Sequence, residues 1–151
     1  MMYEYFDQIL EKSKSNGKNL LSVMLFDLDK FKAVNDTYGD QAGDYVLSEL
    51  AKVVKTKLRP SDFFSRYGGE EFTIFISGGD LKVAVDLAER LRRAIEGHDF
   101  VYNEQSLPVT ISAGVASIKP EMNKWEDLFE EADKASYKSK TNGRNQVSTA
   151  D

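Results

Sequence analysis

Near the middle of the chain, residues 63–76 have the sequence FFSRYGGEEFTIFI. Two runs rich in aromatic and β-branched residues lie on either side of Gly68-Gly69. Glycine reaches the positive φ angles that a tight turn between antiparallel strands requires. The stretch therefore predicts a β-hairpin with two carboxylates, Glu70 and Glu71, directly after its turn.

A second apolar segment lies earlier in the chain, at residues 20–28. It is almost continuously hydrophobic, which is typical of a strand buried on both faces. The segment ends in Asp27-Leu28-Asp29, so two more carboxylates lie at the edge of an apolar strand. If this strand and the hairpin are neighbours in one sheet, the four acidic side chains converge at one end of it.

Helical periodicity and capping residues predict the helices. The first is a short N-terminal helix before residue 13, and the second is a short helix capped by Asp29 and ended by Gly39. A third helix, capped by Asp40, ends near Leu58, and a fourth, capped by Asp80, ends near residue 96. The last helix follows Asn123, which forms a capping box with Glu126. Further strands are expected at 109–118, paired with 99–102, and near 146–148. This order predicts an α+β fold with a largely antiparallel sheet, of the split βαβ type, rather than a doubly wound parallel sheet.

The composition narrows the class of protein. The 151 residues suit a single domain, and a hydrophobic content of 41% is enough for a packed core. The net charge of −5 disfavours general binding to nucleic acid, because neutralising its backbone needs clustered Lys and Arg. The absence of cysteine excludes disulfide and thiolate chemistry. No apolar run approaches the ~18 residues of a membrane span, and the start of the chain has no signal-peptide pattern, so we expect a cytoplasmic domain without membrane contact.

The predicted cluster of Asp27, Asp29, Glu70 and Glu71 indicates a metal site. Neighbouring carboxylates repel one another and take up protons unless a cation compensates their charge. Mg²⁺ does this with oxygen ligands, commonly one or two carboxylates together with phosphate oxygens. Such an ion can activate a hydroxyl nucleophile and stabilise displacement at phosphorus. From spacing alone, the alternative that these acids are solvated turn residues and helix caps stays open.

Several short motifs follow one another in a particular order. They are Asp27-Leu28-Asp29-Lys30-Phe31-Lys32, Asn35-Asp36, Gly43-Asp44, Arg66-Tyr67-Gly68-Gly69-Glu70-Glu71-Phe72, Ala132-Asp133-Lys134-Ala135 and Gly143-Arg144-Asn145. Together they resemble the ordered motifs of the GGDEF domain, over about residues 20–147. The resemblance implies a ferredoxin-like or palm-type cyclase fold. It also implies a diguanylate cyclase, in which two domains meet as a transient homodimer and condense two GTP molecules into cyclic di-GMP, releasing two pyrophosphates.

The resemblance implies roles for the acidic residues. Asp27, the Leu28 carbonyl and Glu70 resemble the ligands of Mg²⁺, with Mn²⁺ as an alternative ion. Glu71 resembles the second acid of the signature, near the metal and the nucleophile. Asp27, Glu70 and Glu71 are therefore the expected catalytic residues.

The remaining motifs imply contacts to GTP. Asn35 and Asp44 resemble the pair that binds guanine, and a carboxylate suits this base because it accepts from N1–H and from the exocyclic amine. Phe31 and Lys32 lie at a predicted helix N-terminus, where backbone N–H groups favour phosphate. Lys140 and Arg144 resemble the cations that hold the β- and γ-phosphates. Cations near a helix C-terminus also have a purely structural explanation, because they interact favourably with the helix dipole.

A second nucleotide site is expected at Arg59-Pro60-Ser61-Asp62. This stretch resembles the RxxD inhibitory site of the family, where cyclic di-GMP binds and restrains turnover, and Arg90 is expected to add a contact. Arginine offers a bidentate fork to guanine or phosphate, and aspartate accepts from guanine donors. The alternative is a plain helix end, with arginine followed by proline and a turn.

Two rival functions remain open from the sequence. One is a sensor domain that binds cyclic di-GMP without turnover, and the other is a palm-type nucleotidyl transferase or cyclase acting on one nucleotide or a different pair. The intact Glu70 and Glu71 argue against the first, and Asp44 argues for guanine. The lead-in segment usual in the family, Asp-x-Leu-Thr-Gly-Leu-x-Asn-Arg, is absent, so we expect residues 1–151 to be a single catalytic domain trimmed at its N-terminus, without a sensory or dimerisation module.

Overall fold

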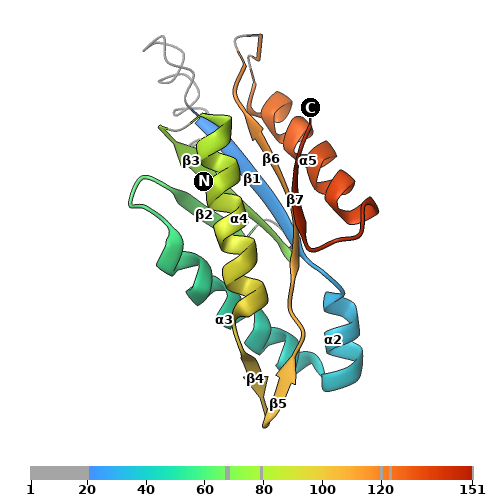
Figure 1. The fold of residues 1–151 in the computed structure, drawn as a ribbon. Coiled ribbons are helices and arrows are strands. Elements are labelled where there is room, and N and C mark those ends of the chain that lie inside the picture. Colours follow the sequence, from blue (N-terminus) through green and yellow to red (C-terminus); the bar gives the residue numbers. More distant parts are fainter. Residues whose placement is uncertain (1–20, 67–68, 79, 120, 123, 151) are drawn as a thin grey trace.

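The computed structural model describes residues 21–66, 69–78, 80–119, 121–122 and 124–150. Its main sheet has five strands in the order β2-β3-β1-β6-β7. The central strand β1 (Leu21–Leu28) pairs antiparallel with β3 (Glu71–Ser77) on one side and with β6 (Ile111–Ser117) on the other. β2 (Phe63–Arg66) continues the sheet beside β3, and β7 (Gln146–Thr149) runs parallel to β6 at the opposite edge (Figure 1).

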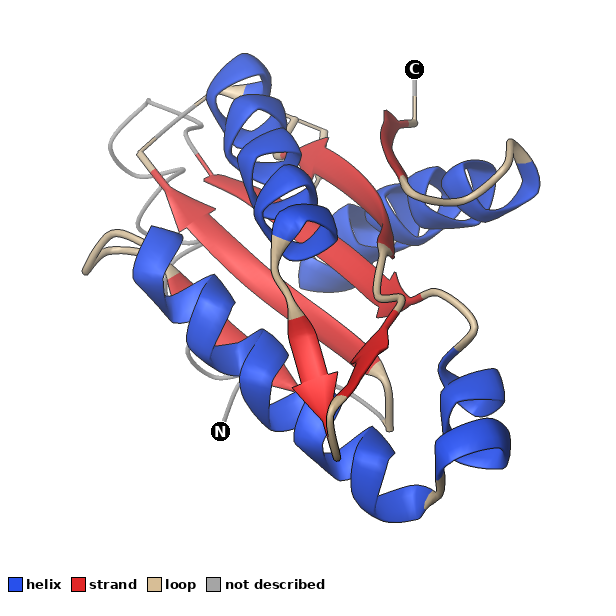
Figure 2. Ribbon diagram, turned by 60° about the horizontal axis from the view of Figure 1, so that its bottom comes forward, coloured by secondary structure: helices blue, strands red, loops and turns tan. Residues whose placement is uncertain are grey.

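Helices cover both faces of this sheet. α3 (Asp40–Lys57) and α4 (Leu81–Gly97) lie on one face, and α5 (Trp125–Thr141) lies on the other (Figure 2). The short helix α2 (Phe31–Tyr38) connects β1 to α3. Within the described ranges, none of the helices has both the length and the apolar sequence needed to cross a membrane.

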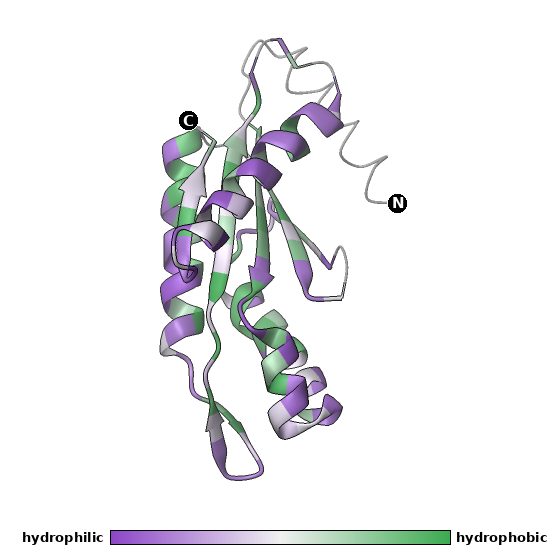
Figure 3. Cartoon of the chain, turned by 90° about the vertical axis from the view of Figure 1, so that its right-hand side faces the viewer, coloured by the Kyte–Doolittle hydropathy of each residue, from purple (hydrophilic) through white to green (hydrophobic). Residues whose placement is uncertain are grey.

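The alternation of side chains along β1 explains why two cores form. Met24, Phe26 and Leu28 belong to the larger core with α3 and α4, while Leu21 and Val23 belong to the smaller core with α5. Successive residues of a strand point to opposite faces, and here both faces are buried. In Figure 3 the inner strands are coloured mainly as hydrophobic and the outer surfaces of the helices mainly as hydrophilic. The prediction of a strand buried on both faces is confirmed.

α5 packs unusually close to β6 because the contact is made by small residues. A Cβ atom on Gly114 would overlap with the backbone nitrogen of Ser136. One turn later, the Ser139 hydroxyl donates to the Ala113 carbonyl at 2.7 Å. These contacts fix the last turns of α5 against the sheet, and therefore fix the position of Lys140.

Two predicted helix caps are confirmed and two are wrong. Gly39 ends α2, and Asp80 caps α4 by accepting from the Val83 N–H at 3.0 Å. In contrast, the N-cap of α2 is Lys30, which has a left-handed backbone (φ 56°), and Asp29 bonds to groups elsewhere in the fold. Asp40 is the first residue of α3, and the N-cap is Gly39. In both cases a backbone with positive φ makes the entry to the helix, so an acidic side chain is not needed there.

The predicted pairing of 99–102 with 109–118 is also wrong. β4 (Phe100–Tyr102) instead pairs with β5 (Gln105–Leu107) in a separate two-stranded sheet. Its turn residues, Asn103 and Glu104, both have left-handed φ angles, of 51° and 67°. Two left-handed residues in a two-residue loop match the right-handed twist of a hairpin.

The antiparallel pairing of β2 with β3 confirms the predicted hairpin. Gly69 belongs to the described part of its turn, whereas Gly68 lies outside the described residues. The predicted N-terminal helix and the cap at Asn123 also lie outside them, and the N-cap of α5 is Lys124.

Candidate active site

Acidic residues meet where β1 ends and β3 begins. Asp27 lies directly opposite Glu71 in the antiparallel register. The Leu28 N–H donates to the Glu70 carbonyl at 3.3 Å, so Glu70 is also held beside the end of β1. The predicted proximity of the Asp27-Leu28 segment to Glu70 and Glu71 is therefore present in the structure. Asp27 is mostly buried, with 17% of its side chain exposed, whereas Glu71 is exposed.

Lys140 reaches the same place from α5. Its Nζ forms an ion pair with Asp27 Oδ2. Opposite charges attract more strongly in a partly buried place than in open water, so the ammonium group compensates the Asp27 carboxylate. Lys140 was expected to contact phosphate, and in the structure it also has an acidic partner on β1.

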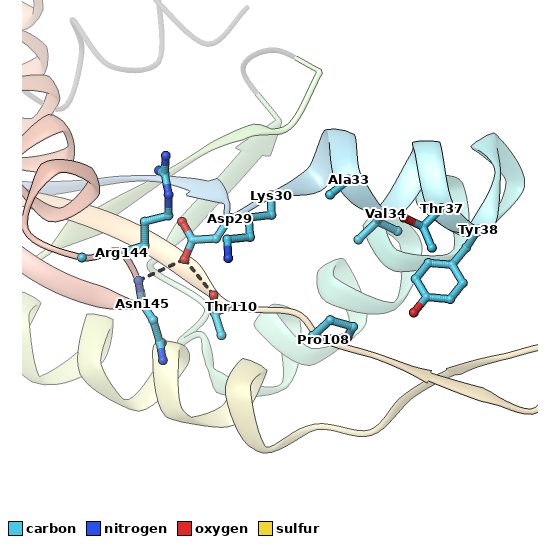
Figure 4. A pocket seen from close by; sticks show the side chains of 11 residues that line it. Asp29, Lys30, Ala33, Val34, Thr37, Tyr38, Pro108, Thr110, Arg144 and Asn145 are labelled. Atoms are coloured by element: carbon cyan, nitrogen blue, oxygen red, sulfur yellow. Dashed lines mark hydrogen bonds between the residues drawn. The ribbon is translucent and has the colours of Figure 1, made fainter.

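Asp29 has a different environment, although it is only two residues from Asp27. It is 9% exposed. Its carboxylate accepts from Thr110 Oγ1 at 2.8 Å and from the Asn145 N–H at 3.0 Å (Figure 4). It also accepts from Ser112 Oγ at 2.6 Å. Because these three donors satisfy its carboxylate, Asp29 does not form the single cluster with Asp27, Glu70 and Glu71 that the sequence predicted.

A pocket of about 470 Å³ opens beside Asp29. It lies between α2, the segment before β6 and the turn after α5 (Figure 4). Lys30 and Arg144 contribute positive charge to its lining, and Val34 and Pro108 contribute apolar surface. This side of the site therefore suits an anionic group.

Asn35 and Asp44 lie on neighbouring helices, α2 and α3. Gly43 makes their approach possible, because a Cβ atom at this position would overlap with the Asn35 amide oxygen. Asp44 is exposed and lines a separate pocket of about 480 Å³ together with Leu47 and Phe64. A carboxylate beside apolar surface suits a flat, hydrogen-bonding base, and the Asn35 amide lies next to Gly43, the residue before Asp44. That Phe64 lines this pocket could not be predicted from the sequence, because its position in a strand indicated only packing.

The predicted phosphate contacts begin at the first turn of α2. Phe31 is half-buried against the larger core, and Lys32 is exposed. The left-handed Lys30 turns the chain from β1 into this helix. The N-terminal N–H groups of α2 therefore begin at Phe31, four residues after Asp27, at the same end of the sheet.

Arg59 and Asp62 contact each other at the end of α3. The Arg59 Nη2 donates to Asp62 Oδ1 at 3.1 Å and to the Ser77 carbonyl at 3.1 Å, and the Arg59 N–H donates to Asp62 Oδ2 at 2.9 Å. These bonds hold the connection between α3 and β2 against β3. Arg90, the third residue of the predicted inhibitory site, is exposed on α4.

Comparison with known families explains this combination of features. The family model described as "Diguanylate cyclase, GGDEF domain" matches residues 1–146. This chain belongs to the GGDEF domain family. The GGDEF domain is 43% identical to Diguanylate cyclase A of Treponema denticola over 135 residues, which cover 89% of this chain and 36% of the relative. It is 39% identical to Response regulator PleD of Caulobacter vibrioides over 140 residues, which cover 91% of this chain and 31% of the relative.

Solved structures agree with the fold of this GGDEF domain. The active GGEEF domain of a diguanylate cyclase from Vibrio cholerae has a TM-score of 0.91 and 34% identity, covering 97% of this chain and 92% of that one. The GGDEF domain of DgcB from Caulobacter crescentus, solved in complex with c-di-GMP, has a TM-score of 0.91 and 31% identity, covering 97% and 86%. The predicted palm-type cyclase fold is confirmed. The chain spans only 22–36% of the length of the first curated relatives.

Proposed function

We propose that this GGDEF domain condenses two GTP molecules into cyclic di-GMP and releases two pyrophosphates. The observation that carries the proposal is the strand register, which sets Asp27 opposite Glu71 and beside Glu70. In each half-reaction, a 3′-hydroxyl oxygen of one GTP bonds to the α-phosphorus of the other. The bond from that phosphorus to the bridging oxygen breaks, pyrophosphate leaves with the electron pair, and the hydroxyl proton passes to a base.

The donor set fits a hard divalent cation. Asp27 and Glu70 offer carboxylates, and Leu28 offers a backbone carbonyl at the end of β1. Across the residues described, no group of three or more acidic, histidine or cysteine side chains is arranged to hold a metal ion. Mg²⁺ needs only one or two protein carboxylates, because water and phosphate oxygens serve as its other ligands. Mn²⁺ accepts similar oxygen donors. When bound, the ion compensates charge on the phosphates and activates the hydroxyl.

The other residues orient the triphosphate and the base. We assign Lys140, Arg144 and the N–H groups near Phe31 and Lys32 to the phosphates, because cations and a helix N-terminus both favour anions. In the structure Lys140 pairs with Asp27, which supports its assignment to a place where metal-bound phosphates would meet the acidic residues. Glu71, exposed and opposite Asp27, is the acid assigned to the attacking hydroxyl.

Asn35 and Asp44 are assigned to the guanine. A carboxylate accepts from N1–H and the exocyclic amine of guanine, whereas adenine has no N1 donor. Because each domain holds one GTP, the reaction requires two domains that meet as a transient homodimer. The rate per domain should therefore rise with protein concentration. A GTP substrate also supports the cytoplasm as the place of the reaction.

Glu70→Gln tests the proposed function. The change removes one charge and keeps the shape of the side chain, so we expect loss of cyclic di-GMP formation from GTP and Mg²⁺, measured by chromatography, with an unchanged circular dichroism spectrum. Glu121→Gln is the matched control, because Glu121 is exposed in the segment between β6 and α5. Retained turnover in Glu70→Gln would remove Glu70 from the metal site.

We also propose product inhibition at Arg59, Asp62 and Arg90. Support comes from the related DgcB domain, which was solved with c-di-GMP, and from the paired Arg59 and Asp62. Arg59→Ala should raise the concentration of cyclic di-GMP needed for inhibition, and Arg93→Ala, an exposed arginine of the same helix as Arg90, is the control. Unchanged inhibition would leave Arg59 with only its structural bonds to Asp62 and Ser77.

The same DgcB complex favours a second candidate function, a sensor that binds cyclic di-GMP without turnover. The two functions differ in one measurable respect. The sensor would bind cyclic di-GMP while GTP remained unreacted at every protein concentration.

A further inference from the structure

We infer that Asp29 positions Arg144, an inference that rests on the proposed contact between Arg144 and the phosphates of GTP. Asp29 directly follows β1, whereas Arg144 lies in the turn between α5 and β7. The two residues are far apart in the sequence and line the same pocket (Figure 4). Their connection is the hydrogen bond from the Asn145 N–H to Asp29 Oδ2, at 3.0 Å.

The turn around Arg144 needs an external restraint. Gly143, Arg144 and Asn145 have φ angles of 117°, 66° and 45°, so three successive residues are left-handed. Residues with a Cβ atom adopt this region at a cost in free energy, and they remain there only when the surroundings hold them. The turn therefore depends on the bonds that its backbone makes to neighbouring elements.

Both peptide N–H groups that flank the Arg144 Cα are held. The Arg144 N–H donates to the Ser139 carbonyl at 2.9 Å, at the end of α5. The Asn145 N–H donates to the Asp29 carboxylate. Together these two bonds set the direction in which the Arg144 side chain leaves the backbone, and one of them is made by a buried charge.

Asp29 itself is fixed from the other side. Thr110 and Ser112 donate to its two oxygens at 2.8 Å and 2.6 Å. The side chain of Asn145 is held by α4, where its Oδ1 accepts from Arg92 at 3.0 Å and its Nδ2 donates to Glu96. The carboxylate thus joins β1 and β6 to the turn, and α4 holds the turn from outside. A carboxylate suits this place because hydrogen bonds to a charged acceptor are stronger than those to a neutral one.

A binding experiment tests the inference without turnover. The ligand is 3′-deoxy-GTP with Mg²⁺, which lacks the attacking hydroxyl, and its affinity is measured by isothermal titration calorimetry. We expect Arg144→Ala to weaken binding about tenfold or more, as for loss of a hydrogen bond between charged groups. Asp29→Ala should weaken binding by a similar factor, and the double variant should bind no more weakly than Arg144→Ala alone.

The double variant separates positioning from general structural support. If Asp29 only supported the fold, its loss would weaken binding by the same factor with or without Arg144, and the inference would be wrong. If Asp29→Ala lacks a cooperative urea transition, Asp29→Asn replaces it. The asparagine amide has only one oxygen to accept from three donors, so we expect Asp29→Asn to lower the affinity for 3′-deoxy-GTP by about threefold. In a domain that also carries Arg144→Ala, Asp29→Asn should have no further effect.

The remaining outcomes distinguish the inference from the proposed function. Full affinity in folded Asp29→Ala, with weakened binding in Arg144→Ala, would overturn the inference alone. Wild-type affinity in Arg144→Ala, or no binding by the wild-type domain, would overturn the proposed phosphate contact and the inference with it.

Discussion

Gly114→Ala offers a sharp test of how α5 is held against the sheet. The new Cβ atom would lie 2.7 Å from the Ala135 carbonyl carbon and would overlap with backbone atoms of Ala132 and Ser136. All three are backbone atoms, so no side-chain rotation relieves the overlap. The helix must retreat by about 1 Å, and overpacking of this kind costs about 1–3 kcal/mol. Because rigid backbone is involved, we expect a loss of about 3 kcal/mol in the free energy of unfolding.

Urea unfolding followed by circular dichroism measures this loss. We expect a lower midpoint with an unchanged slope, since the unfolded chain is the same size. Gly97→Ala is the matched control, because a Cβ atom at the end of α4 would have no atom within 4 Å. The control should be neutral or stabilised by up to about 1 kcal/mol. Equal stability of Gly114→Ala and the wild-type domain, within about 0.5 kcal/mol, would refute the close packing of α5 on β6.

Three further changes test other parts of the structure. A hydrogen bond from Arg92 and its positive charge hold the pKa of the Glu89 carboxyl below its ordinary value of 4.5. The ionised carboxylate therefore stabilises the folded domain fully above pH 4.5, and this contribution is lost as the pH falls through the lowered pKa. The destabilisation caused by Glu89→Gln in urea titrations should therefore shrink between about pH 7 and about pH 3, and a constant difference would contradict the ion pair. Ser139→Ala removes the hydroxyl that bonds the Ala113 carbonyl and should lower the free energy of unfolding by about 1 kcal/mol, whereas an unchanged midpoint would count against that bond. Asp44→Ala should weaken 3′-deoxy-GTP binding without moving the urea midpoint, because Asp44 is exposed, and unchanged affinity would remove it from the guanine site.

The parts of the fold that the sequence predicted depend on local signals. The apolar run before Asp27 predicted β1, and Gly68-Gly69 between β-prone runs predicted the pairing of β2 with β3. Asp80 was correctly placed as the cap of α4 because its partner, the Val83 N–H, lies three residues away. Hydrophobic period and near neighbours decide such features, and both are visible in one sequence.

The role of Asp29 could not be predicted in this way. Before an amphipathic helix, an aspartate is normally expected to be a cap. Its actual partners, Thr110, Ser112 and Asn145, are 81–116 residues away. The pairing of β1 with β6 brings the first two close, and the pairing of β6 with β7 brings Asn145. The hairpin of β4 and β5 escaped prediction for a local reason, because Glu104 is an uncommon residue for a left-handed turn position.

In the candidate site too, some contacts follow from local sequence signals and others depend on distant packing. The sequence predicted that Asp27 meets Glu70 and Glu71 on the condition that their strands are neighbours, and the pairing of β1 with β3 meets that condition. The ion pair of Asp27 with Lys140 joins elements more than a hundred residues apart, and depends on how closely α5 approaches β6. That approach is set by Gly114, whose importance lies in packing and not in any motif.

Incubation of the domain with GTP and Mg²⁺ over a range of protein concentrations, followed by chromatography, tests the proposed function most directly. We expect cyclic di-GMP and pyrophosphate, a rate per domain that rises with protein concentration, and no product from Glu70→Gln. GTP that stays unreacted at high protein concentration, or equal turnover by Glu70→Gln, would contradict it.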